Sequence, residues 1–334
     1  MGDKLLERAI EHHYCIDDPN FRHEMSVMMG PTAIGGNSVT PLRNGVEIFP
    51  AMLQAVEAAE VSITFETHIY WSGEIGRKFA EALAGAAGRG LPVNVLLDWA
   101  GCLKMDHSLL ELMRDAGIRV YFYRPLRWYH LDKLNNRTHR KLMVVDGRIG
   151  FTGGVGIADV WLGDAEDPDH WRDTHYRVEG PVVSQMQAAF NDNWVKTTGQ
   201  VLNGPNYFPA LDDIGDMQAH MFVASPSGGS ESMHLMYLLA IAASVKTIDL
   251  AASYFVPDKL LIEALIAGER DPAVLADLAK GKLRAKIPDL VRALALARRA
   301  GPGVRHQDIG HVGRREPGAD LFWPALAILP SIYS

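Results

Sequence analysis

The chain has 334 residues, of which 48% are hydrophobic and 22% are charged. This composition can form one large domain or two of ordinary size and argues against wholesale disorder. The formal net charge of −7 disfavours a general nucleic-acid binder, which is usually basic. Two cysteines, Cys15 and Cys102, are too few for a disulfide framework and suit a reducing compartment. No Cys/His cluster has zinc spacing, so we expect no metal site.

Residues 1–38 are expected to form an N-terminal extension. Residues 1–30 contain neither a basic n-region nor an apolar h-region, so no signal peptide is predicted. No uncharged apolar run reaches about 18 residues, so no transmembrane helix is predicted either. We therefore expect a cytoplasmic protein, whose contact with a membrane would be peripheral.

Strands and helices alternate in the next part of the chain. Residues 61–65 and 93–98 are rich in Val, Ile, Leu and Phe, as strands are, and an Ala-rich helix is predicted between them at 75–88. A helix over 108–116 and a strand over 119–123 follow. This alternation is typical of an α/β fold with a parallel or mixed sheet.

A β-hairpin is predicted in the middle of the chain. Its strands are residues 141–146 and 149–152, and Asp146-Gly147 between them is a strong turn signal. Gly180-Pro181 then breaks regular structure before a helix that we predict over 183–196.

The second part of the chain repeats the pattern of the first. Residues 201–218 are rich in Gly, Pro, Asn and Asp and are predicted to link the two parts. The sequence at 247–254 echoes that at 62–69, which predicts a second unit of the same kind.

A His-x-Lys pair begins the predicted hairpin, and an Asp follows it five residues later. The three residues are His139, Lys141 and Asp146. The period of two along a strand places His139 and Lys141 on the same face. A neutral imidazole beside a fixed ammonium suits attack on a phosphodiester, with His139 as nucleophile and Lys141 offsetting charge on the phosphoryl oxygens. The alternative is a buried strand and turn that carry a chance His and Lys.

At these residues the chain resembles the phospholipase D superfamily, whose signature is H-x-K-x(4)-D followed by a Gly-Gly or Gly-Ser turn. Within that superfamily it is most similar to the bacterial cardiolipin synthase type. The sequences E-T-H-I-Y at 66–70, W-R-D-T-H at 171–175 and Y-F-V-P-D at 254–258 resemble further segments of these proteins. The likeness extends from about residue 39 to residue 265.

The resemblance implies an α/β fold in which helices flank a mixed sheet. One complete half would occupy residues 39–200, and a second, incomplete half would begin at 219–265. Residues 266–294 resemble a segment of the insertion-sequence transposases with a DEDD active site, although an ordinary amphipathic helical insertion remains the alternative. The sequence contains one complete signature, so residues 295–334 are interpreted as a degraded or truncated remainder.

The resemblance also assigns roles to the residues of the signature. It implies that His139 forms a covalent phosphohistidine, that Lys141 holds the phosphate, and that Asp146 is a structural carboxylate at the strand end. Asp173 matches a carboxylate that orients a catalytic imidazole. His175 would lie either close to Asp173 or in solvent. No metal or other cofactor is required, because lysines and backbone amides hold the charge.

Several further residues are candidates for the site. Gly153 and Gly154 would let the backbone approach the phosphate closely. Gly156 stands where many members carry Asn, which puts one hydrogen bond to the phosphate in doubt. Glu66 would line the substrate pocket or serve as an ordinary salt-bridge partner. His68 lies one residue off the expected face, which favours packing over catalysis.

Three functions remain open. The first is phosphatidyl transfer or phosphodiester hydrolysis on a phospholipid such as phosphatidylglycerol, without a nucleic-acid partner. The second is a non-catalytic remnant that binds phosphate or lipid headgroups, and the third is a nucleic-acid phosphodiesterase. Loss of a general acid/base typically costs about 10²–10⁴ in rate, so a chain with one signature is predicted to be impaired. A homodimer with its site across a two-fold axis would supply the second signature.

Overall fold

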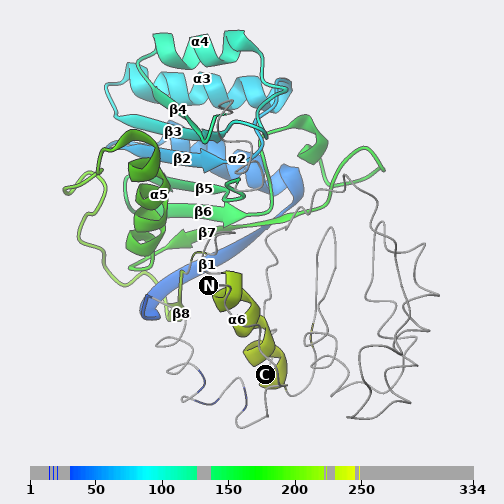
Figure 1. Ribbon diagram of the computed structural model, residues 1–334, viewed down its shortest axis with the longest axis vertical. Helices are drawn as coiled ribbons and strands as arrows, with labels where there is room; N and C mark the ends of the chain where they lie inside the picture. Colours follow the sequence, from blue (N-terminus) through cyan, green and yellow to red (C-terminus); the bar gives the residue numbers. More distant parts are fainter. Residues whose placement is uncertain are drawn as a thin grey trace, which may run out of the picture. The chain divides into compact units, whose positions relative to one another are not determined.

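The computed structural model describes residues 31–125, 137–221 and 230–244, together with Cys15, Asp18, Phe21, Val223 and Ile248. The chain divides into two compact units (Figure 1), of which one is Ser26–Gly229 and the other combines Met1–Met25 with Ser230–Ser334. In the second unit the structure describes one helix, α6 (Ser230–Ala242). The predicted insertion at 266–294 and the remainder at 295–334 lie outside the described residues.

The larger unit contains an eight-stranded mixed sheet in its described part. The strand order is β4-β3-β2-β5-β6-β7-β1-β8, in which β2, β3 and β4 are parallel and the other neighbours are antiparallel. This arrangement confirms the predicted α/β fold with a mixed sheet. The strands are β1 (Ile34–Arg43), β2 (Ile63–Thr67), β3 (Val93–Asp98), β4 (Arg119–Tyr123), β5 (Leu142–Val145), β6 (Ile149–Gly153), β7 (Thr174–Glu179) and β8 (Met217–Ala219).

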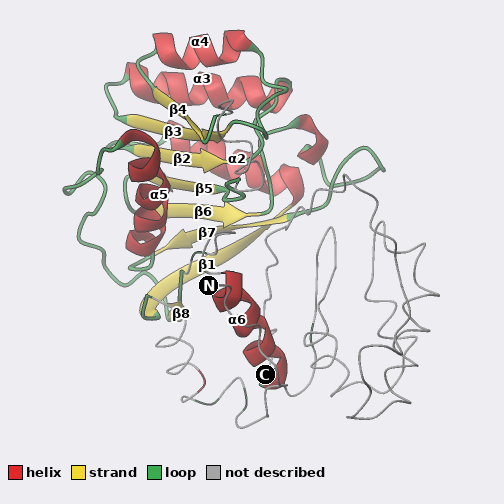
Figure 2. Ribbon diagram, in the orientation of Figure 1, coloured by secondary structure: helices red, strands yellow, loops and turns green. Residues whose placement is uncertain are grey.

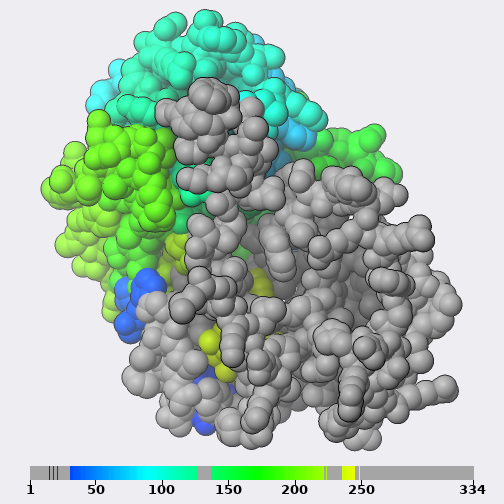
Figure 3. Space-filling model, in the orientation of Figure 1, coloured from blue at the N-terminus to red at the C-terminus, as the bar shows by residue number. Residues whose placement is uncertain are grey.

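Helices cover both faces of this sheet (Figure 2). Three helices, α2 (Asn44–Glu57), α3 (Glu74–Gly88) and α4 (His107–Asp115), pack on one face, and α5 (Val183–Thr198) packs on the other. The space-filling view shows α3 and α4 in cyan and α5 in green at the surface of this unit (Figure 3). None of the described helices is long and apolar enough to cross a bilayer.

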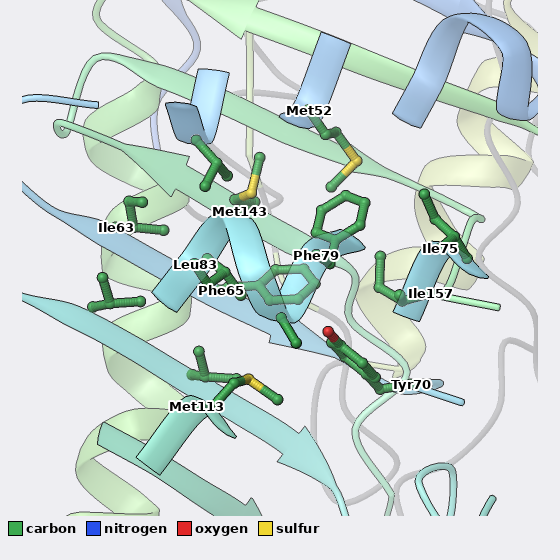
Figure 4. Close-up of a cluster of buried hydrophobic side chains, with 14 of the residues drawn as sticks. Met52, Ile63, Phe65, Tyr70, Ile75, Phe79, Leu83, Met113, Met143 and Ile157 are labelled. Carbon is green, nitrogen blue, oxygen red and sulfur yellow. The ribbon is translucent and has the colours of Figure 1, made fainter. Parts of the chain in front are cut away.

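Within the described residues of this unit, the larger of two hydrophobic cores lies between the sheet and helices α2 to α4 (Figure 4). Phe79 of α3 is central to it: its ring stacks on Phe65 of β2 and meets Phe49 of α2 edge-on, with centroids 6.1 Å apart in both pairs. Contacts of this kind add about 0.5–1.5 kcal/mol beyond the area they bury. They therefore fix α2 and α3 against the strand that leads into the predicted site.

Strand β5 is apolar along its whole length because both of its faces are covered. Met143 and Val145 point into the core beneath α2 and α3, whereas Leu142 and Val144 point into the second core beneath α5. A strand buried on both faces is a continuous hydrophobic run rather than an alternating one. This explains the apolar sequence between the two ends of the signature.

A tight turn joins β5 to β6, as the Asp-Gly pair predicts. Asp146 and Gly147 have φ values of 56° and 64°, and the N–H of Arg148 donates to the carbonyl of Val145 (2.9 Å), so three residues separate the paired Val145 and Ile149. The Asp146 carboxylate accepts hydrogen bonds of 2.7–3.2 Å from the backbone N–H groups of Glu60, Val61 and Ser62. The turn is thereby tied to the start of β2, at the opposite end of β5 from His139 and Lys141.

Residues predicted to link the two parts pack on the same sheet. The Ser62 hydroxyl donates to the carbonyl of Asn206 (2.6 Å), and the Asn94 amide donates to the Tyr207 hydroxyl (3.1 Å). Strand β8 then extends the sheet beside β1. Residues 201–219 are therefore part of the larger unit, and the domain boundaries drawn from the sequence stay a prediction.

Replacing Asp146 should lower the unfolding free energy rather than the catalytic rate. Asp146→Ala removes every acceptor for the three N–H groups and places Ala in a left-handed conformation, so we expect a loss of about 1–3 kcal/mol in unfolding free energy. Asp146→Asn keeps one acceptor oxygen and tolerates the positive φ, so its loss should be smaller. Urea unfolding of both variants measures this. Equal stability of the wild type and the Ala variant would contradict the structural role.

Candidate active site

The signature residues and several other polar side chains lie at one edge of the sheet. Because β5 is antiparallel to β2 and β7 is antiparallel to β6, the starts of β5 and β7 meet the ends of β2, β3 and β6. The residues brought to this edge are His68, Asp98, Thr138, His139, Lys141, Gly153, Gly154, Asp173 and His175.

The imidazole of His139 is partly buried and packs against a second imidazole. The ring centroids of His139 and His68 lie 4.3 Å apart, with 31° between the ring planes. Burial lowers the pKa of His139 to about 4, and a proton on His68 or the charge of Lys141 acts in the same direction. His139 is therefore neutral at pH 7 and carries an unprotonated ring nitrogen, as a nucleophile requires.

Lys141 remains a cation beside this neutral ring. Burial lowers the pKa of Lys141 to about 8, while the carboxylates of Asp173 and Asp98 oppose that shift. The ammonium donates a hydrogen bond of 3.2 Å to the backbone carbonyl of His139. Since a pKa near 8 leaves most of the lysine protonated at pH 7, Lys141 can offset charge on a phosphoryl group.

Two buried carboxylates hold the residue that precedes His139. The backbone N–H of Thr138 donates to Asp98 Oδ2 (3.1 Å), and its hydroxyl donates to Glu66 Oε1 (2.5 Å). Asn193 of α5 donates a further bond of 2.7 Å to the same Glu66 oxygen. These bonds connect β2, β3 and α5 to the segment before β5, and so they determine where His139 lies.

Glu66 is fully buried and sits among polar groups of the chain itself. Burial raises the pKa of its carboxyl to about 6, although Arg140, Thr138 and Asn193 favour the charged form. Its second oxygen, Oε2, has no hydrogen-bond partner among the described residues. Through these contacts, Glu66 holds the segment that precedes β5. Its expected place in the substrate pocket stays a prediction.

Asp173 lies just before β7, close to the turn that contains Gly153 and Gly154. Its Oδ1 accepts the N–H of Thr174 (2.7 Å), and Lys141 is the charged residue that acts on it most strongly. Burial raises the pKa of this carboxyl. A Cβ atom at Gly154 would come within 2.3 Å of the carboxylate, so only glycine allows this approach. The predicted orientation of an imidazole by Asp173 stays a prediction.

His175 is buried, which settles where its side chain lies. It is 1% exposed and pairs with Gly153 across β6 and β7, where a Cβ atom would lie 2.6 Å from its Nδ1. Burial, aided by the charge of Lys141, lowers its pKa to about 3. The solvent-exposed alternative for His175 is therefore wrong.

Gly156 has a packing reason for its departure from the family pattern. A Cβ atom there would lie 2.8 Å from Cβ of Ile69 and 3.2 Å from the ring of Trp161. An asparagine side chain has no room at this position unless both neighbours move. The backbone of this turn therefore packs directly against the residues that follow β2.

Sequence reasoning missed the contributions of Asp98 and His68. Asp98 is the last residue of the strand predicted at 93–98. A charged residue at the end of a buried strand is the signal that could have identified it as part of the site. His68 was expected to be a packing residue, yet its ring contacts that of His139. No cluster of three or more His, Cys, Asp or Glu side chains in the described ranges is placed to hold a metal ion.

Known proteins match the part of the chain that contains the signature. Residues 52–194, a stretch that includes the whole cluster, match the family model described as "Cardiolipin synthase, PLD-like domain". The chain contains a phospholipase D-like domain. Among curated proteins it is similar to a cardiolipin synthase of Geobacillus thermodenitrificans (strain NG80-2), with 34% identity over 227 residues that cover 67% of this chain and 45% of that protein.

A cardiolipin synthase 1 of Bacillus cereus is 35% identical over 242 residues, which cover 68% of this chain and 47% of that protein. The chain thus spans about half the length of the curated relatives it matches. Among solved structures, Nuc, a phospholipase D family member from Salmonella typhimurium, has 14% identity and a TM-score of 0.39, covering 50% of this chain and 99% of Nuc.

The raised pKa of Glu66 should make the unfolding free energy depend on pH. Its pKa is about 6 in the fold and 4.5 in the unfolded chain, so its stabilising contribution is full below pH 4.5 and is lost as the pH rises through 6. The unfolding free energy of the wild type relative to Glu66→Gln should therefore increase by about 2 kcal/mol from pH 7 to pH 4.5. Urea unfolding at several pH values tests this, and a pH-independent difference would refute it.

Proposed function

We propose that this chain is a phospholipase D-type phosphatidyltransferase or phosphodiesterase that acts on phospholipids through a phosphohistidine on His139. One observation carries the proposal: the neutral imidazole of His139 and the ammonium of Lys141 lie together at the sheet edge. The pKa of His139 is lowered to about 4 and that of Lys141 to about 8, so both groups are in the required protonation state at pH 7.

The reaction would take place in two steps at the same histidine. In the first, a ring nitrogen of His139 bonds to phosphorus, the phosphorus–oxygen bond to the alcohol breaks, and the leaving alkoxide takes a proton from solvent to become the alcohol. In the second, water or another alcohol loses a proton and attacks phosphorus, which releases His139. Lys141 stabilises the charge on the phosphoryl oxygens in both steps.

Phospholipids are the proposed substrates because the similar curated proteins are named cardiolipin synthases. With phosphatidylglycerol as donor and acceptor, the two steps would form cardiolipin and release glycerol. Two exposed apolar side chains support a peripheral approach to a membrane: Leu103, 68% exposed, follows β3, and Trp171, 48% exposed, precedes β7. Both belong to loops at the edge that carries the site.

The second candidate is a phosphate- or headgroup-binding protein without turnover. It is favoured by the sequence, which contains one complete signature where two are expected. A homodimer with a shared site would restore the second signature and stays a prediction. The nucleic-acid phosphodiesterase remains the least favoured, since the net charge is −7.

Trapping the intermediate distinguishes the first two candidates. The full chain is incubated with acyl- and headgroup-labelled phosphatidylglycerol in mixed micelles and denatured at neutral or alkaline pH, because phosphohistidine is acid-labile. We expect acyl label on His139 and none on a folded His139→Ala variant. Absence of label on a folded wild-type chain that still binds the micelles would favour the binding protein.

The pH profile of turnover provides an independent test. The rate should rise as the pH increases through about 4, where His139 loses its proton, and fall above about 8, where Lys141 loses its proton. Lys141→Arg keeps its charge at alkaline pH, so its remaining activity should lack the alkaline decline. An identical alkaline limb in both proteins would show that Lys141 does not cause it.

A further inference from the structure

A second imidazole is built into the site beside the nucleophile. His68 follows β2, is 6% exposed, and places its ring centroid 4.3 Å from that of His139. With 31° between the planes, the two rings are in tilted contact. His68 therefore acts on the nucleophile through packing and charge.

The position of His68 is fixed from several sides. Its Nδ1 lies 3.7 Å from Oδ1 of Asp98, too far for a hydrogen bond, and a hydrogen bond joins the His68 side chain to the backbone of Thr138. Asp98 is itself held by the N–H groups of Ala100 (2.9 Å) and Gly101 (3.1 Å). A side chain is excluded at Gly101, where a Cβ atom would lie 3.2 Å from Cε1 of His68 and 1.8 Å from its carbonyl oxygen.

We propose that His68 is a positioning residue for the proposed reaction: its ring, next to Asp98, packs against the ring of His139 and sets the position and the electrostatic surroundings of the nucleophile. The inference rests on the proposed function, because it assigns His68 a role through His139. It goes beyond the signature, which does not include position 68.

The geometry favours positioning over acid catalysis by His68. In an in-line displacement at phosphorus, the leaving oxygen lies opposite the attacking nitrogen. A ring that packs against the nucleophile lies on the attacking side of phosphorus. It cannot reach the leaving oxygen on the other side, so its effect on the rate must pass through His139.

Charge couples the two imidazoles to each other and to their neighbours. His68 faces Asp98 and the cations Lys141 and Arg137, while His139 faces His68, Lys141 and Asp98. A proton on either ring opposes a proton on the other, and burial next to Lys141 lowers the pKa of both to about 4. The pair therefore stays neutral under mildly acidic conditions in which an isolated imidazole would become protonated.

Two substitutions at His68 distinguish the effect of its packing against His139 from the effect of its charge. His68→Ala removes the ring, so kcat should fall about tenfold to a hundredfold with little change in the KM for phosphatidylglycerol, because the nucleophile loses its support. His68→Phe keeps a flat ring but cannot be protonated. It should retain more of kcat than the Ala variant, and its acidic limb should move to higher pH.

The titration of His139 provides a readout that does not depend on turnover. In the full chain with isotope-labelled histidine, the His139 resonance, assigned with a His139→Gln variant, should titrate at higher pH in His68→Phe than in the wild type. A folded His68→Ala variant with unchanged kcat would overturn the support role. An unchanged His139 titration in His68→Phe would overturn the charge role.

Failure of this inference is distinguishable from failure of the proposed function. If His139→Ala keeps its turnover, the proposed function is wrong whatever the His68 variants do. If His139→Ala is inactive and both His68 variants match the wild type in kcat and acidic limb, the proposed function stands and the role of His68 is refuted. Circular dichroism and urea unfolding of each variant establish that it is folded.

Discussion

The antiparallel insertion of β5 beside β2 is the constraint on which the site depends. A parallel β5 would place His139 and Lys141 at the opposite edge of the sheet, away from the ends of β2 and β3. In the observed direction, the segment before β5 reaches the buried carboxylates of Glu66 and Asp98, and both bind Thr138. The Asp146 carboxylate secures the other end of β5 through the backbone N–H groups before β2.

Burial and charge oppose one another throughout this cluster. Burying an ionised group is costly unless an opposite charge or hydrogen bonds compensate it. Lys141 keeps a pKa of about 8 because Asp173 and Asp98 lie near it, whereas the neighbouring histidines stay neutral. The result is the ammonium of Lys141 beside neutral imidazoles, an arrangement suited to attack on an anionic phosphodiester by an uncharged nucleophile.

Small residues allow this cluster to be dense. Gly154 admits the Asp173 carboxylate, Gly153 admits His175, and Gly101 leaves room for His68. Each of these glycines brings backbone close to a polar side chain that a Cβ atom would displace. The glycine-rich turn after the hairpin thus accommodates the buried side chains behind it, and its contact with a phosphate stays a prediction.

Local patterns predicted much of the first half of the chain. The apolar runs at 93–98 and 119–123 form the strands β3 and β4 with those bounds, and the Asp-Gly turn forms as expected. The strands β1 and β7 were not predicted. Both lie toward the far side of the sheet, where β1 pairs with β7 and with β8, and their polar and apolar residues mix without a clear period.

The sequence by itself determined the signature, the hairpin and the α/β class, because each depends on residues close together in the chain. Only the tertiary structure decided which other groups surround His139. The contacts of His68 with His139 and of Asp98 with Thr138 join residues some 40 to 70 positions apart, and no local period encodes such a contact. It follows from strand order and direction, which arise when the two faces of the sheet are buried together.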